Sequence, residues 1–257
     1  MSARAKSVVG RLLRGVRAGA ERGRGVRASS FTEVERAERI FYLNYLREGM
    51  TVFDAGANVG ELTLLFSRFV GEGGSVHAFE PGAAAYERLS AVCRAASLRN
   101  VRLNRLALAE DEGAVRLHVY DDEYLGWTTR ARRPLADYGI DVPPPSAEDV
   151  PATTIDLYCE QNGVGVIDLL KIDVEGAELQ VLLGAERALR ERRVRCVTFE
   201  FGQTTFDMGN SPAEIEDLLG RAGYRVRNLI DGDAAFPGRE GAQFARYSMH
   251  VATLVGR

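Results

Sequence analysis

Residues 50–60, MTVFDAGANVG, constrain the fold of this chain more than any other stretch. Thr51–Ala55 reads as a buried strand, because the run is short, apolar and bounded by turn residues. Gly56 and Gly60 then turn the chain into Glu61–Val70, which has apolar residues at helical spacing. Glycine has no Cβ and a helix N-terminus attracts acceptors, so a ligand can approach this backbone closely. The stretch therefore predicts a ligand-binding strand–turn–helix unit.

The composition is that of an ordinary globular protein, with 46% hydrophobic and 27% charged residues in 257. This length is enough for one large α/β domain with a substantial core. No apolar run reaches the roughly 18 residues of a membrane span. Cys93, Cys159 and Cys196 are scattered and lack CxxC spacing, which favours buried thiols in a reducing compartment, and hence the cytoplasm.

The net charge of −3 hides a basic N-terminal segment. Residues 1–30 hold eight basic residues against Glu21 alone. We expect a flexible, solvated tail, with a peripheral contact to an anionic membrane surface or an organelle-targeting role as the alternatives. The remaining residues are acidic, so no nucleic-acid partner is expected.

Strand and helix patterns alternate along residues 31–257, which we expect to form a single domain with a mainly parallel sheet and helices on both faces. The 61–70 helix is expected to turn Leu62, Leu65, Phe66 and Phe69 inward. Residues 121–152 lack sustained periodicity and predict a long loop that could cover an acceptor. The expected helices are 31–48 (capped by Thr32), 61–70, 83–96, 154–161, 176–190 and 213–221, and the expected strands are 51–55, 75–79, one from 101, 115–120, 167–172, 194–201, 224–230 and 248–255.

The glycine turn does not match the usual phosphate-binding patterns. The dinucleotide fingerprint has a glycine between Gly56 and Gly60 that is absent here, and no Gly-Lys-Ser/Thr occurs. Asp54 would oppose a pyrophosphate but could receive the cationic end of an amino-acid-like ligand. Glu80 closes the second strand, where a carboxylate can accept hydrogen bonds from two ribose hydroxyls. A ligand with a ribose, no phosphate and a positive amino acid is S-adenosylmethionine.

Three segments carry a resemblance to a known family: VFDAGANVGELTLLFS (residues 52–67), HAFEP (77–81) and ATTIDLYCEQNGVGVIDLLKIDVEGAELQVLLGAERAL (152–189). The chain resembles the FkbM-type methyltransferases, a branch of the class I S-adenosylmethionine-dependent enzymes. The resemblance implies a Rossmann-like, doubly wound, seven-stranded sheet with the last strand antiparallel. It also implies methyl transfer to oxygen on a sugar, a polyketide or another small metabolite, as in natural product or glycan biosynthesis.

We expect the cofactor to contact residues at the ends of the first three strands and at the end of the fourth. Each position also has a structural interpretation. Asp54 could cap the strand–helix turn, Glu80 could cap the helix begun by Pro81, and Asn58 could be a left-handed turn residue. The residues after the third strand could simply pack. The predicted cofactor-binding residues are Asp54, Gly56, Ala57, Asn58, Gly60, Glu80, Pro81, Asn104, Ala107, Leu108 and Asp173.

Asp173, Glu175 and Glu200 are the predicted catalytic residues. Asp173 ends the fourth strand beside the expected methyl group, Glu175 follows it, and Glu200 is an acid within an apolar strand, which is costly without a partner. An alcohol acceptor must lose its proton to a base or be acidified by a metal, and these carboxylates suit either route. Mg²⁺ prefers oxygen ligands, but the sequence does not decide whether a metal takes part. Glu178 is expected only to complement the helix dipole.

Three further points stay open at the level of sequence. Trp127, Tyr124 and Tyr138 could form an aromatic lid over the acceptor or anchor the long loop to the body of the protein. A nicotinamide-dependent oxidoreductase and a catalytically silent cofactor-binding protein are the alternatives to a methyltransferase. The oligomeric state is not determined.

Overall fold

A computed structural model describes residues 29–122, 124–238 and 245–256 of the chain. The basic segment 1–30 lies outside these residues except for Ser29 and Ser30, so its predicted role stays a prediction. Within the described part, no helix combines the length and the apolar character needed to cross a membrane.

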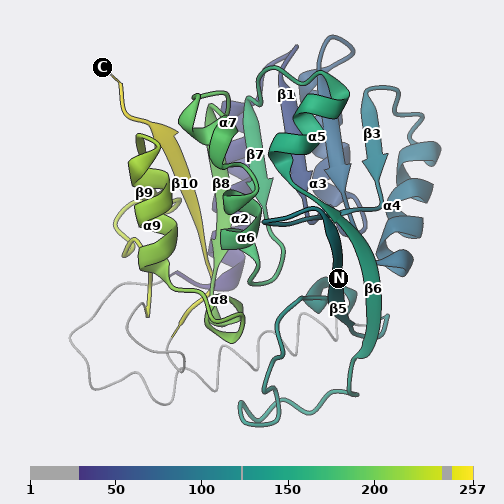
Figure 1. The fold of residues 1–257 in the computed structure, drawn as a ribbon, viewed down its shortest axis with the longest axis vertical. Coiled ribbons are helices and arrows are strands. Elements are labelled where there is room, and N and C mark those ends of the chain that lie inside the picture. Colours follow the sequence, from purple (N-terminus) through teal and green to yellow (C-terminus); the bar gives the residue numbers. More distant parts are fainter. Residues whose placement is uncertain (1–28, 123, 239–244, 257) are drawn as a thin grey trace.

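The body of the protein is a seven-stranded sheet in the order β3-β2-β1-β7-β8-β10-β9 (Figure 1). β1, β2, β3, β7 and β8 run parallel, whereas β10 is antiparallel to both of its neighbours. The predicted mostly parallel sheet with an antiparallel last strand is confirmed. The strands are β1 Thr51–Ala55, β2 Ser75–Phe79, β3 Val101–Asn104, β7 Leu169–Ile172, β8 Cys196–Phe201, β9 Tyr224–Asn228 and β10 Ser248–Leu254.

Helices cover both faces of this sheet, as predicted. On one face α5 (Ile155–Asn162), α6 (Glu178–Leu183), α7 (Glu186–Arg190) and α9 (Pro212–Arg221) pack against the larger apolar core. On the other face lie α2 (Phe31–Tyr45), α3 (Glu61–Val70) and α4 (Ala83–Ala95). Successive strand residues alternate between these faces, so both faces are apolar because both are covered.

Local sequence signals explain some of the helix ends. Ser211 caps α9 in a capping box with Glu214, and Pro212 takes the first helical position. Ser30 makes the same box with Glu33 at the start of α2, so the predicted cap at Thr32 was two residues too late. In α3 the predicted inward face was partly wrong. Phe69 is 41% exposed, whereas Thr63 and Ser67 are buried among polar partners.

A second, three-stranded sheet was not predicted. Its order is β4-β6-β5, formed by Ala107–Leu108, Ser146–Thr153 and Gly113–Val119. β6 takes up the last part of the predicted 121–152 loop, which is therefore shorter than expected and also holds one short 3-10 turn, Leu125–Trp127. This small sheet lies near the carboxyl ends of the parallel strands, at the lower edge in Figure 1.

Two other segments differ from expectation. The predicted 176–190 helix is broken into α6 and α7 at Gly184, where a Cβ would lie 2.0 Å from the carbonyl oxygen of Ala109. The predicted loop before Ser211 contains α8, Gln203–Asp207. Both α6 and α8 begin just beyond the carboxyl end of a strand, so they frame the same edge as the small sheet (Figure 1).

Candidate active site

The carboxyl ends of β1 and β7 lie side by side at the point where the strand order reverses. β1 leads outward to β2 and β3, whereas β7 leads to β8 on the other side. Ligands of open α/β sheets bind at such a switch point. The turns at 56–60 and 173–177, both singled out in the sequence, therefore meet at the edge where a ligand is expected.

The 56–60 turn is built from left-handed backbone. The φ angles of Gly56, Asn58 and Gly60 are 78°, 48° and 91°. Glycine adopts such angles freely and asparagine tolerates them, so the left-handed conformation predicted for Asn58 is confirmed. The amides of Gly56 and Ala57 both donate to the carbonyl of Phe79, at 3.0 and 2.9 Å. These two amides already donate hydrogen bonds within the protein. A ligand would therefore meet the shape of the turn and not these two donors.

Asp54 lies beneath this turn and is fully buried. The Thr63 hydroxyl donates to its Oδ2 at 2.6 Å, and the Lys171 Nζ lies 3.1 Å from its Oδ1. The sequence predicted that Asp54 receives the cationic end of a ligand. The geometry gives it internal hydroxyl and cationic partners, and its contact with a ligand stays a prediction.

Glu80 joins the glycine turn to the start of α4. Its Oε2 accepts the Asn58 amide and its Oε1 accepts the Gly82 amide, both at 2.8 Å. The Gly82 contact confirms a cap at the residue before α4, although this helix begins at Ala83 and not at Pro81. Burial raises the pKa of Glu80 to about 7. Each carboxylate oxygen keeps a second lone pair, so capping and ribose binding are compatible.

The residues after β3 are largely used for packing. The Asn104 side chain donates to the Ala78 carbonyl at 3.1 Å and accepts from the Tyr158 hydroxyl at 3.2 Å. Ala107 and Leu108 form β4 and are buried in the small sheet and the larger core. The prediction that these three residues contact adenine stays a prediction.

Asp173, Glu175 and Glu200 come together. One carboxylate oxygen of each lies within 4.8 Å of those of the other two. Asp173 and Glu175 belong to the turn after β7, and Glu200 is the penultimate residue of the adjacent strand β8. Their side chains meet because both parallel strands end at this edge. Three oxygen donors at this spacing could hold a divalent cation or share protons.

Burial of Glu175 and Glu200 raises the pKa of each and so favours the protonated form. Burial raises the pKa of Glu175 to about 8, with repulsion from Asp173 and Glu178 adding to the effect and Arg133 opposing it. Burial also raises the pKa of Glu200 well above its usual range, and Glu175 and Asp173 reinforce this. The cluster therefore carries protons at neutral pH.

Glu178 is the first residue of α6 and closes the turn before it, beyond the dipole role that was expected. Its Oε1 accepts the amides of Val174 and Gly176 at 3.2 and 3.1 Å, which closes the turn after β7. Glu175 has a φ of 54° in the same turn, an unusual angle for a residue with a side chain. Glu178 thus helps to hold Glu175 in this strained position.

The 124–138 part of the long loop is anchored over the acids. Arg133 lies 3.7 Å from Glu175 and 3.5 Å from Asp207, and its guanidinium stacks 5.5 Å from the Trp127 ring centroid. The Tyr138 hydroxyl donates to Asp207 at 2.6 Å. These contacts show the anchoring role of Trp127 and Tyr138, whereas a lid over an acceptor stays a prediction.

Thr129 makes a further contact between this loop and the acids. Its hydroxyl donates to the backbone carbonyl of Glu175 and accepts the Ala131 amide at 2.9 Å. Thr129 is 1% exposed. Sequence reasoning missed Thr129 and Arg133, because nothing in a loop without periodicity marks the residues that contact a distant turn.

Lys171 is the other residue that sequence reasoning missed. It lies within the LLKIDVEGAE motif, yet only the acids of that motif were assigned roles. A compositional signal was present: of the 33 lysines and arginines in the chain, only Lys6 and Lys171 are lysines. A lysine kept within an apolar strand of so arginine-rich a chain marks a position that requires a compact ammonium group.

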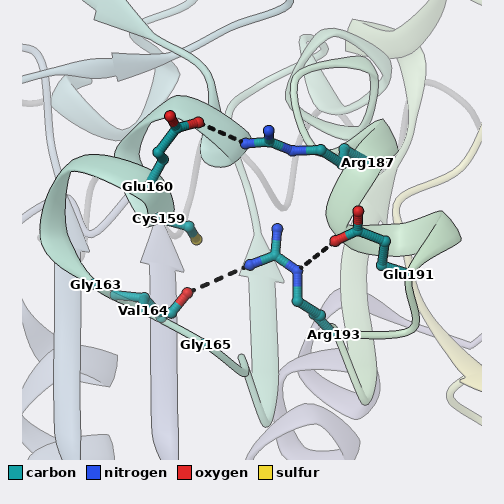
Figure 2. Close-up of a pocket in the computed structure, with 8 residues that line it drawn as sticks. All are labelled: Cys159, Glu160, Gly163, Val164, Gly165, Arg187, Glu191 and Arg193. Carbon is teal, nitrogen blue, oxygen red and sulfur yellow. Dashed lines mark hydrogen bonds and ion pairs between the residues drawn. The ribbon is translucent and has the colours of Figure 1, made fainter.

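A hollow of about 380 Å³ lies elsewhere on the molecule, between α5 and α7 (Figure 2). Its arginines, Arg187 and Arg193, are each paired with a glutamate, Glu160 and Glu191. Residues 163–165 and 193 precede β7 and β8, so the hollow faces the amino ends of the strands. It lies away from the acid cluster and is not part of the site.

This fold, with the site at the switch point, is a Rossmann-like architecture. A structure from Streptococcus mutans, described as a proposed methyltransferase in complex with SAH, aligns with a TM-score of 0.50 and 9% identity over 89% of this chain and 100% of that chain. A methyltransferase FkbM from Methylobacillus flagellatus aligns with a TM-score of 0.49 and 15% identity, over 96% of this chain and 60% of that chain.

Sequence comparison identifies the family. The methyltransferase FkbM domain model matches residues 54–226. The 31-O-demethyl-FK506 methyltransferase FkbM of Streptomyces tacrolimicus is 31% identical over 223 residues, which span 78% of this chain and 81% of that protein. The chain belongs to the FkbM methyltransferase family and is an S-adenosylmethionine-dependent methyltransferase.

Proposed function

We propose that this protein transfers the methyl group of S-adenosylmethionine to a hydroxyl oxygen of a small molecule or glycan. The observation that carries the proposal is the cluster of Asp173, Glu175 and Glu200 beside the glycine turn. An alcohol needs a base to take its proton during transfer, and carboxylates at the expected position of the methyl group supply one. A relative is named for methylation of an oxygen, which supports the same chemistry.

The residues around the glycine turn fit the cofactor. Asn58 Oδ1 is buried and has no hydrogen-bond partner among the described residues, so an acceptor remains for a ligand donor. Glu80 would accept the ribose hydroxyls through its remaining lone pairs. Asp173, with 34% of its side chain exposed, would contact the cofactor's amine. When bound, the cofactor supplies a methyl group on an already activated leaving group.

The acids would then act on the acceptor. A base works best when its pKa lies near the working pH, and the pKa of Glu175 is about 8. We therefore propose Glu175 as the group that takes the acceptor's proton, with Asp173 orienting the amine. Glu200, buried and protonated, would donate a hydrogen bond to Asp173 and so hold the Asp173 side chain in place. The 124–138 loop would exclude water from the cluster of acids.

The proposed transfer is metal-independent or weakly metal-assisted. The three carboxylates have oxygen donors that suit Mg²⁺. Arg133, 3.7 Å from Glu175, and Lys171, 3.7 Å from Asp173, already offset part of their negative charge. If methyl transfer required added Mg²⁺ and EDTA abolished it, this part of the proposal would be overturned.

The test is a methyl-transfer screen with radiolabelled S-adenosylmethionine over sugars, glycosides and polyketide alcohols, with and without EDTA. We expect label in an alkali-stable ether product, because an ester would show transfer to a carboxylate instead. Calorimetric titration with S-adenosylmethionine and with NADH separates the methyltransferase from the oxidoreductase alternative. Cofactor binding without turnover on any acceptor would favour a silent binding protein.

A further inference from the structure

Lys171 lies in the middle of the sheet, on the face covered by α2 and α3. It sits on β7 opposite Asp54 of β1 and Thr198 of β8. Its side chain is 2% exposed. The same face carries a layer of buried polar groups in which Tyr42 of α2 contacts both Glu38 and Thr198, at 2.8 and 3.0 Å. A charged lysine is stable here only if oxygen atoms surround it.

The Lys171 ammonium contacts both turns of the proposed cofactor site. Its Nζ donates to the Gly56 carbonyl at 2.8 Å and to the Ala55 carbonyl at 3.3 Å. It also lies 3.1 Å from Asp54 Oδ1 and 3.7 Å from Asp173 Oδ2. One cation therefore joins the backbone of the glycine turn to the side chain of Asp173.

We propose that Lys171 is a positioning residue for the amino-acid end of S-adenosylmethionine. It acts through two groups, the Gly56 carbonyl and the Asp173 carboxylate, whose relative placement it fixes. Asp54 holds the ammonium from beneath, which gives that buried carboxylate a structural role. This inference rests on the proposed function, because it assigns Asp173 to the cofactor's amine.

The shape of the ammonium supports the proposal. Its three donors radiate from one atom toward the Ala55 and Gly56 carbonyls and Asp54, and its charge also lies 3.7 Å from Asp173. The planar fork of arginine is larger and aims its donors within one plane, so it does not reproduce this arrangement. In a chain whose other described cations are arginines, the one lysine lies where the two turns meet.

A purely structural role makes a different prediction. If Lys171 only neutralised Asp54, a variant that lacks both charges would bind S-adenosylhomocysteine as well as wild type does. If Lys171 positions Asp173 and Gly56, the same variant would bind S-adenosylhomocysteine more weakly than wild type does. Binding of the amino-acid end of the ligand would then be weakened. Binding of the adenosine end, which Glu80 would hold, would not change.

The experiment compares two probes, S-adenosylhomocysteine and adenosine, by calorimetry on the full chain. The variant is Asp54→Asn with Lys171→Met, which removes the buried charge pair. We expect a melting temperature within about 3 °C of wild type, an S-adenosylhomocysteine Kd raised about tenfold or more, and an adenosine Kd within about twofold. Arg195→Met, which removes a cation beside Asp168 at the amino edge, is the control and should change neither Kd.

Equal weakening of both probes, or an unchanged Kd for S-adenosylhomocysteine, would overturn the proposal. Lys171→Arg gives a second measurement if the double variant does not fold, because it retains the charge opposite Asp54. We expect the same selective loss of S-adenosylhomocysteine binding in folded Lys171→Arg, and wild-type affinity there would refute the inference. If wild type itself binds neither probe, the proposed function fails first and Lys171 loses its assigned role with it.

Discussion

Gly56 packs directly on Asp173. A Cβ built on Gly56 would lie 1.8 Å from the Asp173 carbonyl oxygen, and the Asp173 amide donates to the Ala55 carbonyl at 3.1 Å. The turn after β1 and the turn after β7 thus form one continuous surface. This contact explains why a glycine is needed at position 56 independently of any ligand.

Gly56→Ala should damage the fold and the site together. The φ of 78° is strained for alanine, and the new methyl group meets backbone that has no room to move. We expect a loss of about 2 kcal/mol or more in unfolding free energy and a large loss of S-adenosylhomocysteine affinity. Denaturant unfolding and calorimetry measure the two effects.

Gly220→Ala is the matched control for Gly56→Ala. Gly220 lies within α9 and nothing is within 4 Å of an added Cβ. It should stabilise the protein by about 0.5–1 kcal/mol through helix propensity and leave affinity unchanged. Equal effects of the two alanines would contradict the packing argument.

Glu80→Gln should weaken cofactor binding without unfolding the protein. The substitution removes the negative charge and sets an amide NH₂ against one of the two backbone donors at 2.8 Å. Hydrogen bonds to a charged group are worth about 1.5–3 kcal/mol, so the Kd of S-adenosylhomocysteine should rise about 10- to 100-fold. Glu214→Gln, in the exposed capping box of α9, should leave the Kd unchanged. A wild-type Kd in Glu80→Gln would remove Glu80 from the ribose site.

Glu175→Gln should lower turnover while the cofactor still binds. Loss of a general base typically costs about 10²- to 10⁴-fold in rate. Because the pKa of Glu175 is about 8, the base is ionised above that value, so wild-type kcat should rise with pH toward 8 and above. Glu175→Gln should lose this rise.

Asp173→Asn and Glu200→Gln complete the test of the acids. Asp173→Asn should raise the Kd for the cofactor, because its carboxylate is assigned to the amine. Glu200→Gln keeps a neutral hydrogen-bonding group and should lower kcat less than Glu175→Gln does. Full turnover with unimpaired acceptor binding in both variants would refute the proposed role of the carboxylates.

Glu178→Gln should change the pH dependence of stability. Burial raises the pKa of Glu178 from 4.5 to about 7 in the folded protein. Its stabilising contribution is therefore fully present below about pH 4.5 and is lost as pH rises through 7. A glutamine still accepts the Val174 and Gly176 amides but does not titrate. The advantage of Glu178→Gln over wild type should grow by on the order of 2 kcal/mol between pH 5 and pH 8, measured by denaturant unfolding. Parallel stability curves would contradict this.

The central strands were predictable because their signals are local. Thr51–Ala55 and Ser75–Phe79 match the predicted bounds. Each is a short apolar run ended by a turn residue, and burial on both faces demands that pattern. The long FkbM-like motif at 152–189 identified the family, since its residues are consecutive in the chain.

The small sheet was not predictable in the same way. Residues 146–153, SAEDVPAT, contain a proline and little apolar character. They form β6 because β5 pairs along their whole length, from Gly113 opposite Ala152 to Val119 opposite Ser146. Strand formation there depends on a partner some 30 residues earlier, and no local propensity reports it.

The sequence alone determined the fold class, the family and the identity of the three acids, because each follows from residues that are neighbours in the chain or end a recognisable strand. The tertiary structure decided what those residues contact. It turned Asp54 inward onto Lys171, brought Glu200 to Asp173, and set Arg133 and Thr129 of the long loop on Glu175. These relationships join strands and loops that are far apart in the sequence, and only the packing of the sheet brings them within reach of one another.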